Sequence, residues 1–231
     1  MQYTGIKDSM GCYPEACILH LPDTGKHRMP ALLNTIKNNP ITVIDDITIV
    51  TTATADILNE YPLVDQLKNS NINFINAGED FNEVWQRKVK VPLVNAAMEK
   101  VKTPYTLVLD ANDVVILKDI DNEFIEKFKK FDCDIVFNGS WVLYPNTPNT
   151  HIESDRKSPF YHHYINAGAC FGYTDKIAQL YQTAFENSNT TKYRPIDSEQ
   201  YYIRTSIIDN KDLLNVKIDD GSHLFLVSNG N

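Results

Sequence analysis

The chain has 231 residues, of which 42% are hydrophobic and 23% are charged, as in ordinary globular domains. Its formal net charge is -8 and it contains no basic block, which argues against a nucleic-acid partner because phosphates attract lysine and arginine. No apolar stretch approaches the roughly 20 residues of a membrane-spanning helix, and the opening residues lack the apolar segment of a signal peptide. The four cysteines form no C-x-x-C pair, which favours free thiols in a reducing compartment.

Hydrophobic periodicity predicts alternating strands and helices over the first 138 residues. Strands are predicted at residues 16–21, 47–51, 72–75, 105–110 and 134–137, and helices at residues 30–37, 56–68, 82–101 and 120–131. Pro92 must kink the helix at residues 82–101 or begin its second half. Such alternation predicts an α/β fold with a mostly parallel central sheet flanked by helices.

The pattern changes after residue 138. Residues 139–165 are rich in Pro, Asn, Ser, His and Tyr, and a loop of that length is usually functional or disordered. The segment at 165–173 reads as a strand interrupted by glycines, where the backbone can approach a ligand closely. Further helices are predicted around residues 177–185 and 198–208, and a strand region begins at residue 216.

Two carboxylates, Asp110 and Asp113, follow the apolar run at 105–110. Open α/β sheets bind their ligands at the carboxyl edge, where such a strand delivers its last side chains. Two neighbouring carboxylates repel each other unless a cation lies between them, so the pair indicates a hard divalent metal ion that serves a phosphate. The alternative is that Asp113 caps the following turn and Asp110 only ends the strand.

Four segments of the chain carry a resemblance when they are taken in order. They are residues 107–115, 166–173, 197–202 and 218–225, the last followed by Asn229-Gly230. Together they resemble the GT-A glycosyltransferase domain of the procollagen lysyl hydroxylases and its viral and microbial relatives, over roughly residues 80–231. The resemblance implies a Leloir enzyme that moves a hexose from UDP-glucose or UDP-galactose to a hydroxyl of a glycan or protein, with Mn²⁺ or possibly Mg²⁺. We therefore expect one GT-A domain over residues 1–231, in a cytoplasmic enzyme of viral or microbial origin. About 1–115 would be its nucleotide-binding half and about 116–231 its sugar and acceptor half.

The resemblance also implies roles for the metal-binding residues. In the family the Asp-x-x-Asp pair binds the metal, which corresponds to Asp110 and Asp113. A histidine near the end of the domain completes the site in relatives, but this chain has Asp220 at that position and His223 three residues later. Either residue could be the third ligand, since Mn²⁺ and Mg²⁺ also accept carboxylate oxygen, or the site has only two protein ligands.

Further residues are expected around the donor and the acceptor. The resemblance implies that Lys88, or its rival Arg87, holds the diphosphate, and that the aromatic-Pro pair beginning at Tyr144, with Trp141 before it, covers the donor or pins its own loop. Donor-binding positions are expected at Lys88, Asn112, Tyr144, Asn166, Gly168 and Gly230. Asn166 and Gly168 would line the sugar, or instead form an edge-strand bulge.

The catalytic positions implied by the resemblance are Asp197 and Glu199, whose carboxylates would accept the proton of the acceptor hydroxyl or bind the hydroxyls of the acceptor. The alternative for Asp197 is a cap at the start of the helix at 198–208. Two other functions compete with a glycosyltransferase. A phosphatase with an aspartyl nucleophile would have Asp-x-Asp near its start, which disfavours it, and the altered metal histidine motivates a catalytically inactive carbohydrate- or protein-binding module.

Overall fold

The structure is a computed structural model, which describes residues 16–22, 40–54, 61–147, 162, 164–190, 192 and 195–227. The six strands of the main sheet are β2 (Ile47–Thr52), β3 (Phe74–Asn76), β4 (Tyr105–Asp110), β6 (Ile135–Ser140), β7 (Tyr164–Tyr173) and β8 (Val216–Asp219). A smaller sheet contains β1 (Ile18–His20), β5 (Val114–Ile116) and β9 (Phe225–Val227). The helices are α2 (Pro62–Asn69), the 3₁₀ turn η3 (Arg87–Val89), α3 (Lys90–Met98), α4 (Asn122–Lys129), α5 (Thr174–Ser188) and α6 (Glu199–Asp209).

The main sheet has the strand order β3-β2-β4-β7-β6-β8. The pairs β2–β3, β2–β4 and β6–β8 are parallel, as the α/β pattern predicts, but β7 runs antiparallel to both β4 and β6. Strand β7 is also the longest, with ten residues, and its register with β6 shifts at Phe137/Asn138. The predicted α/β fold with a central sheet flanked by helices is therefore confirmed, but the sheet is mixed, because the antiparallel strand β7 lies within a sheet that was expected to be mostly parallel.

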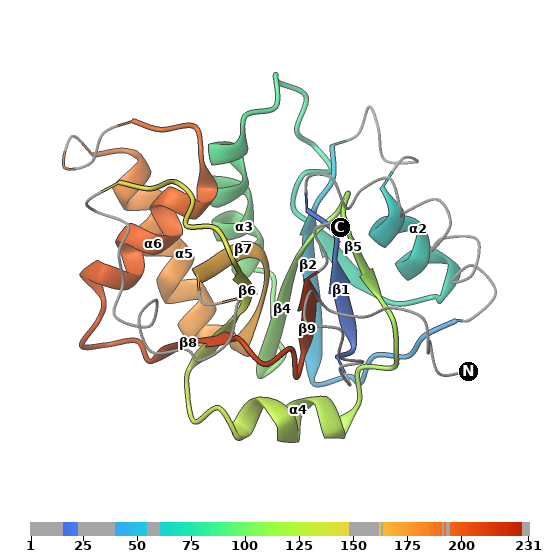
Figure 1. The fold of residues 1–231 in the computed structure, drawn as a ribbon. Coiled ribbons are helices and arrows are strands. Elements are labelled where there is room, and N and C mark those ends of the chain that lie inside the picture. Colours follow the sequence, from blue (N-terminus) through green and yellow to red (C-terminus); the bar gives the residue numbers. More distant parts are fainter. Residues whose placement is uncertain are drawn as a thin grey trace.

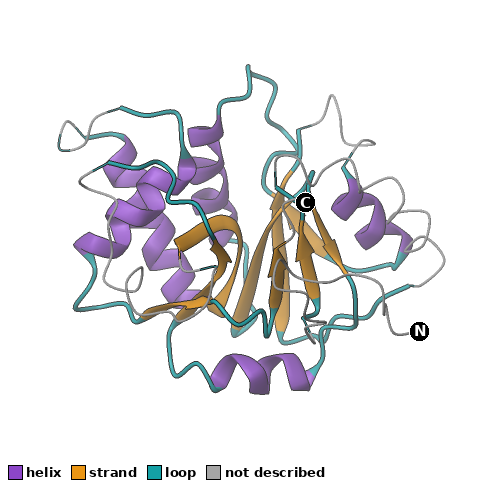
Figure 2. Cartoon of the chain, in the orientation of Figure 1, coloured by secondary structure: helices purple, strands orange, loops and turns teal. Residues whose placement is uncertain are grey.

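Layers of helix and strand enclose the main sheet on both faces, and Figures 1 and 2 show their arrangement. One core joins that sheet to α3, α5 and α6, with Val94, Leu180 and Ile203 fully buried. The opposite core joins it to the small sheet, α2 and α4, with Phe128 and Phe171 fully buried. The central strands alternate between these cores, so Val108 faces the first and Leu107 the second.

The small sheet has the order β5-β1-β9. Strand β1 is antiparallel to β5, with His20 opposite Val114, and parallel to β9, with His20 opposite Val227. The backbone N–H of Leu21 continues the first ladder by donating to the carbonyl oxygen of Asp113 at 2.7 Å. This pairing places the end of β1 directly beside the turn that follows β4.

Several helix boundaries differ from those predicted. The helix predicted at 82–101 is shorter, because residues 82–86 are not helical and the 3₁₀ turn η3 precedes α3. Pro92 is the third residue of α3, where its missing N–H leaves no helical hydrogen bond unmade. The helix predicted at 30–37 lies outside the described residues. Within the ranges that the structure describes, no helix is both long and apolar enough to cross a bilayer.

Candidate functional site

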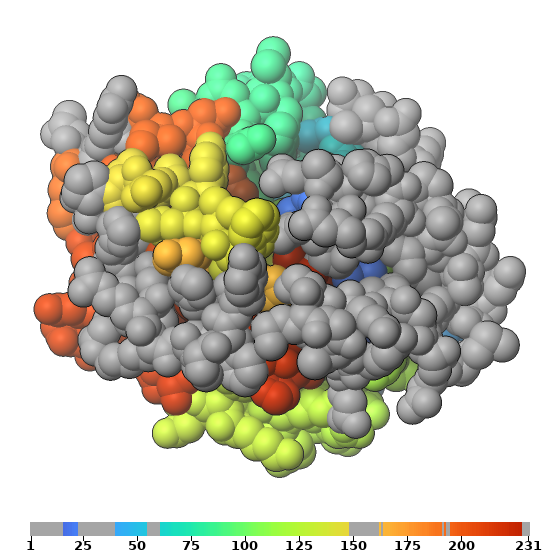
Figure 3. Space-filling view, in the orientation of Figure 1, coloured from blue at the N-terminus to red at the C-terminus, as the bar shows by residue number. Residues whose placement is uncertain are grey.

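A cavity of about 630 Å³ opens at the carboxyl end of β4. Its wall comes from the β4–β5 turn, strand β7, the start of α6 and two surface segments around residues 85–87 and 141–144. Figure 3 shows the second segment, in yellow, meeting the green segment that precedes α3 at the protein surface. Ligand pockets of proteins have volumes of about 300–1,000 Å³, so this cavity can hold a nucleotide-sized molecule.

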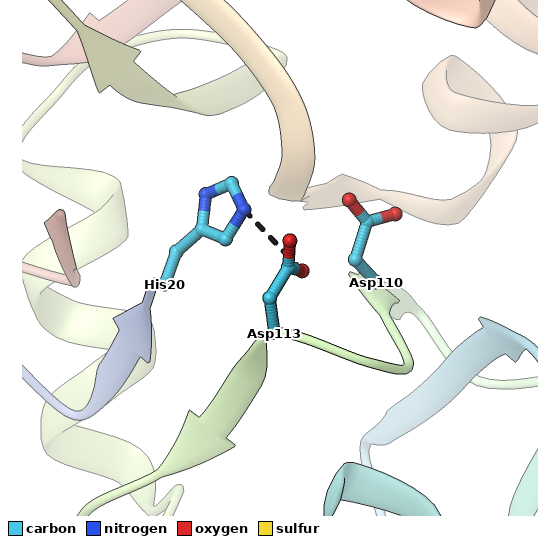
Figure 4. A group of neighbouring side chains, drawn as sticks. All are labelled: His20, Asp110 and Asp113. Atoms are coloured by element: carbon cyan, nitrogen blue, oxygen red, sulfur yellow. Dashed lines mark ion pairs between the residues drawn. The ribbon is translucent and has the colours of Figure 1, made fainter. Parts of the chain in front are cut away.

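Three side chains that could hold a metal ion converge in this cavity (Figure 4). His20, Asp110 and Asp113 each offer a ligand atom, and these atoms all lie within 4.8 Å of one another. Asp110 is the last residue of β4, Asp113 precedes β5 and His20 ends β1. Nε2 of His20 lies 3.5 Å from Oδ1 of Asp113, and both residues are buried, with 2% and 6% exposure. The group combines two carboxylates with one imidazole.

Lys90 is the first residue of α3 and its side chain reaches the same site. Its Nζ lies 2.5 Å from Oδ1 of Asp110 and donates to the carbonyl oxygen of Ala167 at 2.9 Å. Burial acts to lower the pKa of Lys90, but the carboxylates of Asp110 and Glu199 outweigh it and raise the pKa above its ordinary value. Lys90 is therefore a fixed positive charge within the cavity.

The start of α6 delivers Glu199 and Gln200 to the cavity. Burial raises the pKa of Glu199, although the positive charge of Lys90 opposes that rise. Gln200 joins two parts of the wall: its Oε1 accepts from the backbone N–H of Ala167 at 3.0 Å, and its Nε2 donates to the carbonyl oxygen of Tyr144. The helix thus connects β7 to the segment at 141–147.

Of the positions expected to bind the donor, the structure brings Asn112, Tyr144, Asn166 and Gly168 to the cavity. The side-chain Oδ1 of Asn166 accepts from the backbone N–H of Gly168 at 2.7 Å. A Cβ atom at position 168 would lie 2.7 Å from Nε2 of His20, closer than real Cβ contacts. Gly168 therefore leaves the space that the imidazole occupies.

Among the residues predicted for the donor and for catalysis, Lys88 and Asp197 lie away from the cavity wall. Lys88 is exposed, and its backbone N–H donates to Oδ1 of Asp197 at 3.0 Å. Asp197 does not cap α6, because the hydroxyl of Ser198 accepts from the backbone N–H of Tyr201 instead. Arg87, the rival of Lys88, does line the cavity. Gly230 lies outside the described residues.

The structure does not bring Asp220 or His223 to the two aspartates. Neither belongs to the metal-binding group or lines the cavity, and the exposed ring of His223 packs against Phe131 at a centroid distance of 6.0 Å. Asp219 instead organises this segment: its carboxylate accepts from the backbone N–H groups of residues 223, 224 and 225 at 2.6–2.8 Å. The short loop between β8 and β9 therefore turns His223 away from the site.

Two residues of the site, His20 and Lys90, were not predicted. The strand at residues 16–21 was expected, but a single histidine near its end gave no sign of its partners, which are 90 or more positions away. Lys90 lies two residues beyond Lys88, and only the true start of α3 shows which lysine points inward. The available signal in the sequence was a lysine directly before the apolar residues of this helix.

Comparison with known proteins identifies the family of the chain. A search of curated protein sequences found no significant match. The chain is similar to the crystal structure of 4-diphosphocytidyl-2C-methyl-D-erythritol synthase from Anaerococcus prevotii DSM 20548, with 10% identity, a TM-score of 0.38, and coverage of 78% of this chain and 89% of that chain. The sequence profile of the PLOD GT domain matches residues 45–231. The chain therefore belongs to the PLOD GT domain family and is a glycosyltransferase domain.

Proposed function

We propose that the protein transfers a hexose from a UDP-sugar to a hydroxyl acceptor, with a divalent metal ion held by Asp110 and Asp113. The observation that carries this proposal is the convergence of both carboxylates with the buried Lys90 in one cavity, in a chain of this family. UDP-glucose and UDP-galactose are the donors we favour, and the acceptor is a hydroxyl of a glycan or protein.

The residues at the site fit a divalent cation. Asp110 and Asp113 offer carboxylate oxygens, which Mn²⁺ and Mg²⁺ both accept, and their mutual repulsion is relieved when a cation lies between them. When bound, the ion neutralises charge that develops on the departing UDP. Of the two ions we favour Mn²⁺.

The protein's own side chains take the remaining roles in this proposal. Lys90, rather than the exposed Lys88, lies where a point charge can attract the diphosphate. Asn166 and the backbone beside Gly168 line the same cavity and would hydrogen-bond the hexose. Glu199 would accept the proton of the acceptor hydroxyl, because burial raises its pKa and so makes its carboxylate a stronger base.

We also propose that the whole sequence forms one GT-A domain with two functional halves. Residues up to about 115 contribute β2, β4 and Lys90 to the nucleotide side of the cavity. Residues from about 116 contribute β7, the start of α6 and the segment at 141–144, which would face the sugar and the acceptor.

The proposed function is tested by UDP release from UDP-glucose and UDP-galactose, measured with and without Mn²⁺, and by thermal stabilisation with UDP and Mn²⁺ together. We expect Mn²⁺-dependent UDP release that Asp113→Asn abolishes while far-UV circular dichroism stays unchanged. Asp212→Asn, an exposed acid in the turn after α6, is the matched control and should keep activity. Absence of both UDP release and UDP-dependent stabilisation would favour an inactive binding module instead.

A further inference from the structure

We propose that His20 is the third protein ligand of the cation at Asp110 and Asp113, and that Asn138 holds its ring in the ligating orientation. The inference rests on the proposed function and adds a residue that the family match does not include, since His20 precedes the matched residues 45–231. The relatives described above place a histidine where this chain has Asp220. Here a strand from the other end of the sequence would supply the imidazole.

The strand pairing fixes His20 at this place. His20 pairs with Val114 in the antiparallel ladder of β1 and β5, and the bond from Leu21 N–H to the carbonyl oxygen of Asp113 extends that ladder by one residue. The imidazole is therefore held beside the carboxylate of Asp113 by backbone hydrogen bonds on the same strands. The side chain of His20 is also held by the surrounding protein, because only 2% of the residue is exposed.

The distances suit a shared cation. Ligand atoms bind Mg²⁺-sized ions at about 2.1 Å, so two ligands of one ion are at most about 4.2 Å apart. The three candidate ligand atoms lie within 4.8 Å of one another, so a small movement of the side chains would let all three bind one ion. Gly168 leaves room for the ring on its other side, because any Cβ there would contact Nε2 of His20.

Asn138 provides the outer contact that metal-bound histidines usually have. It is fully buried on β6, and its Nδ2 lies 2.7 Å from Nδ1 of His20. Its Oδ1 has no hydrogen-bond partner within the described part of the chain. Turning the amide would let Oδ1 accept a hydrogen bond from Nδ1–H, which leaves the lone pair of Nε2 for the cation. The other explanation of the same contacts is a purely structural histidine bonded to Asp113 and Asn138.

An imidazole ligand has a consequence for the choice of ion. Mg²⁺ and Ca²⁺ prefer sites built only of oxygen, whereas imidazole suits transition metals. Two carboxylates and one imidazole therefore favour Mn²⁺ over Mg²⁺ and Ca²⁺. If His20 is a ligand, removing its imidazole should reduce Mn²⁺ affinity more than Mg²⁺ affinity.

The direct test is pulsed electron paramagnetic resonance of Mn²⁺ bound to the full chain in the presence of UDP. A coordinated imidazole nitrogen produces characteristic ¹⁴N modulation, which changes when the protein is labelled with ¹⁵N-histidine. We expect that modulation in the wild-type protein, where no substitution can perturb folding. Bound Mn²⁺ without histidine nitrogen modulation would overturn the role of His20 and leave the two-aspartate site intact.

Variants then assign the nitrogen to one histidine. We expect His20→Gln to lose the modulation and to weaken Mn²⁺ binding by about tenfold or more, measured by calorimetry. The matched control is His223→Gln, which should keep both signals because that ring packs on Phe131. Loss of the modulation in His223→Gln instead would also overturn the inference. If wild-type protein binds no Mn²⁺ with UDP, the proposed function itself fails.

Discussion

Nζ of Lys90 lies 2.5 Å from Oδ1 of Asp110, so the first residue of α3 is bonded to the last residue of β4. The same ammonium donates to the carbonyl oxygen of Ala167 on β7. The buried ammonium group of Lys90 thus joins α3 to the neighbouring strands β4 and β7 at the edge of the sheet where the cavity opens. It also partly neutralises a carboxylate that would otherwise face Glu199 and Asp113.

Replacing Lys90 should therefore affect stability and activity together. Removing one partner of a buried ion pair costs about 3–5 kcal/mol, and we expect less here because the Asp110 side chain is 24% exposed and solvent screens it. Lys90→Met should lower the free energy of unfolding in urea and abolish metal-dependent UDP release. Lys88→Met is the matched control, because Lys88 is exposed and, within the described residues, it bonds through its backbone N–H. Equal loss of activity in both variants would contradict this assignment.

Lys90 lines the cavity whereas Lys88, two residues before it, is exposed, and only part of this site could be predicted from the sequence. The strand at 105–110 and the aspartates that follow its apolar residues could be predicted, because this prediction uses only residues that are adjacent in the sequence. The direction of a lysine near a helix start depends on the start itself. Residues 82–86 are extended or irregular and η3 intervenes, so the phase of α3 could not be extrapolated from a longer predicted helix.

Pairing between strands that are far apart in the sequence explains the other features that could not be predicted. The antiparallel direction of β7 leaves no mark on hydrophobic periodicity, because both strand directions alternate their side chains with period two. His20 meets Asp113 only through the pairing of β1 with β5, which joins residues more than 90 positions apart. The third-ligand positions at Asp220 and His223 were expected from the resemblance alone, and in the structure, where Asp219 bonds the loop, neither residue lines the cavity.

The bonds of Asp219 make its substitution a sharp test of that loop. Both carboxylate oxygens accept backbone N–H groups, Oδ1 from His223 and Oδ2 from Leu224 and Phe225. In Asp219→Asn an amide NH₂ must face at least one of these donors, which leaves it without an acceptor. A lost hydrogen bond to a charged group costs about 1.5–3 kcal/mol, so we expect at least that loss in the free energy of unfolding. Asp220→Asn should change stability far less, and an equal loss would show that the loop is arranged differently.

The pH dependence of stability should reveal Glu199. Burial raises its pKa in the folded protein above the ordinary value of 4.5, so the folded state binds the proton more tightly than the unfolded state. Its contribution to stability is therefore complete below pH 4.5 and is lost as pH rises through the raised pKa. Relative to wild type, Glu199→Gln should become more stable between pH 4.5 and neutral pH, as urea unfolding at several pH values would measure.

A control separates this effect from general charge effects. Glu83→Gln removes the same charge from an exposed position and should follow the wild-type pH profile. If Glu199→Gln also follows that profile, the carboxyl group of Glu199 is not buried against Lys90 as the structure has it.

The contact between Gly168 and His20 can be tested without any ligand. Adding a methyl group at position 168 forces it against the imidazole, because the new Cβ would lie 2.7 Å from Nε2. Overpacking of this kind costs about 1–3 kcal/mol, and we expect Gly168→Ala to lose that much free energy of unfolding.

The cost should depend on the imidazole. His20→Ala opens space beside residue 168, so Gly168→Ala in that background should lose much less stability than it does alone, and the two effects should not add. A double-mutant cycle in urea measures this coupling directly. If Gly168→Ala costs the same with and without the histidine side chain, then β7 and β1 do not bring these residues together. The geometry that places His20 beside the two aspartates would then be wrong as well.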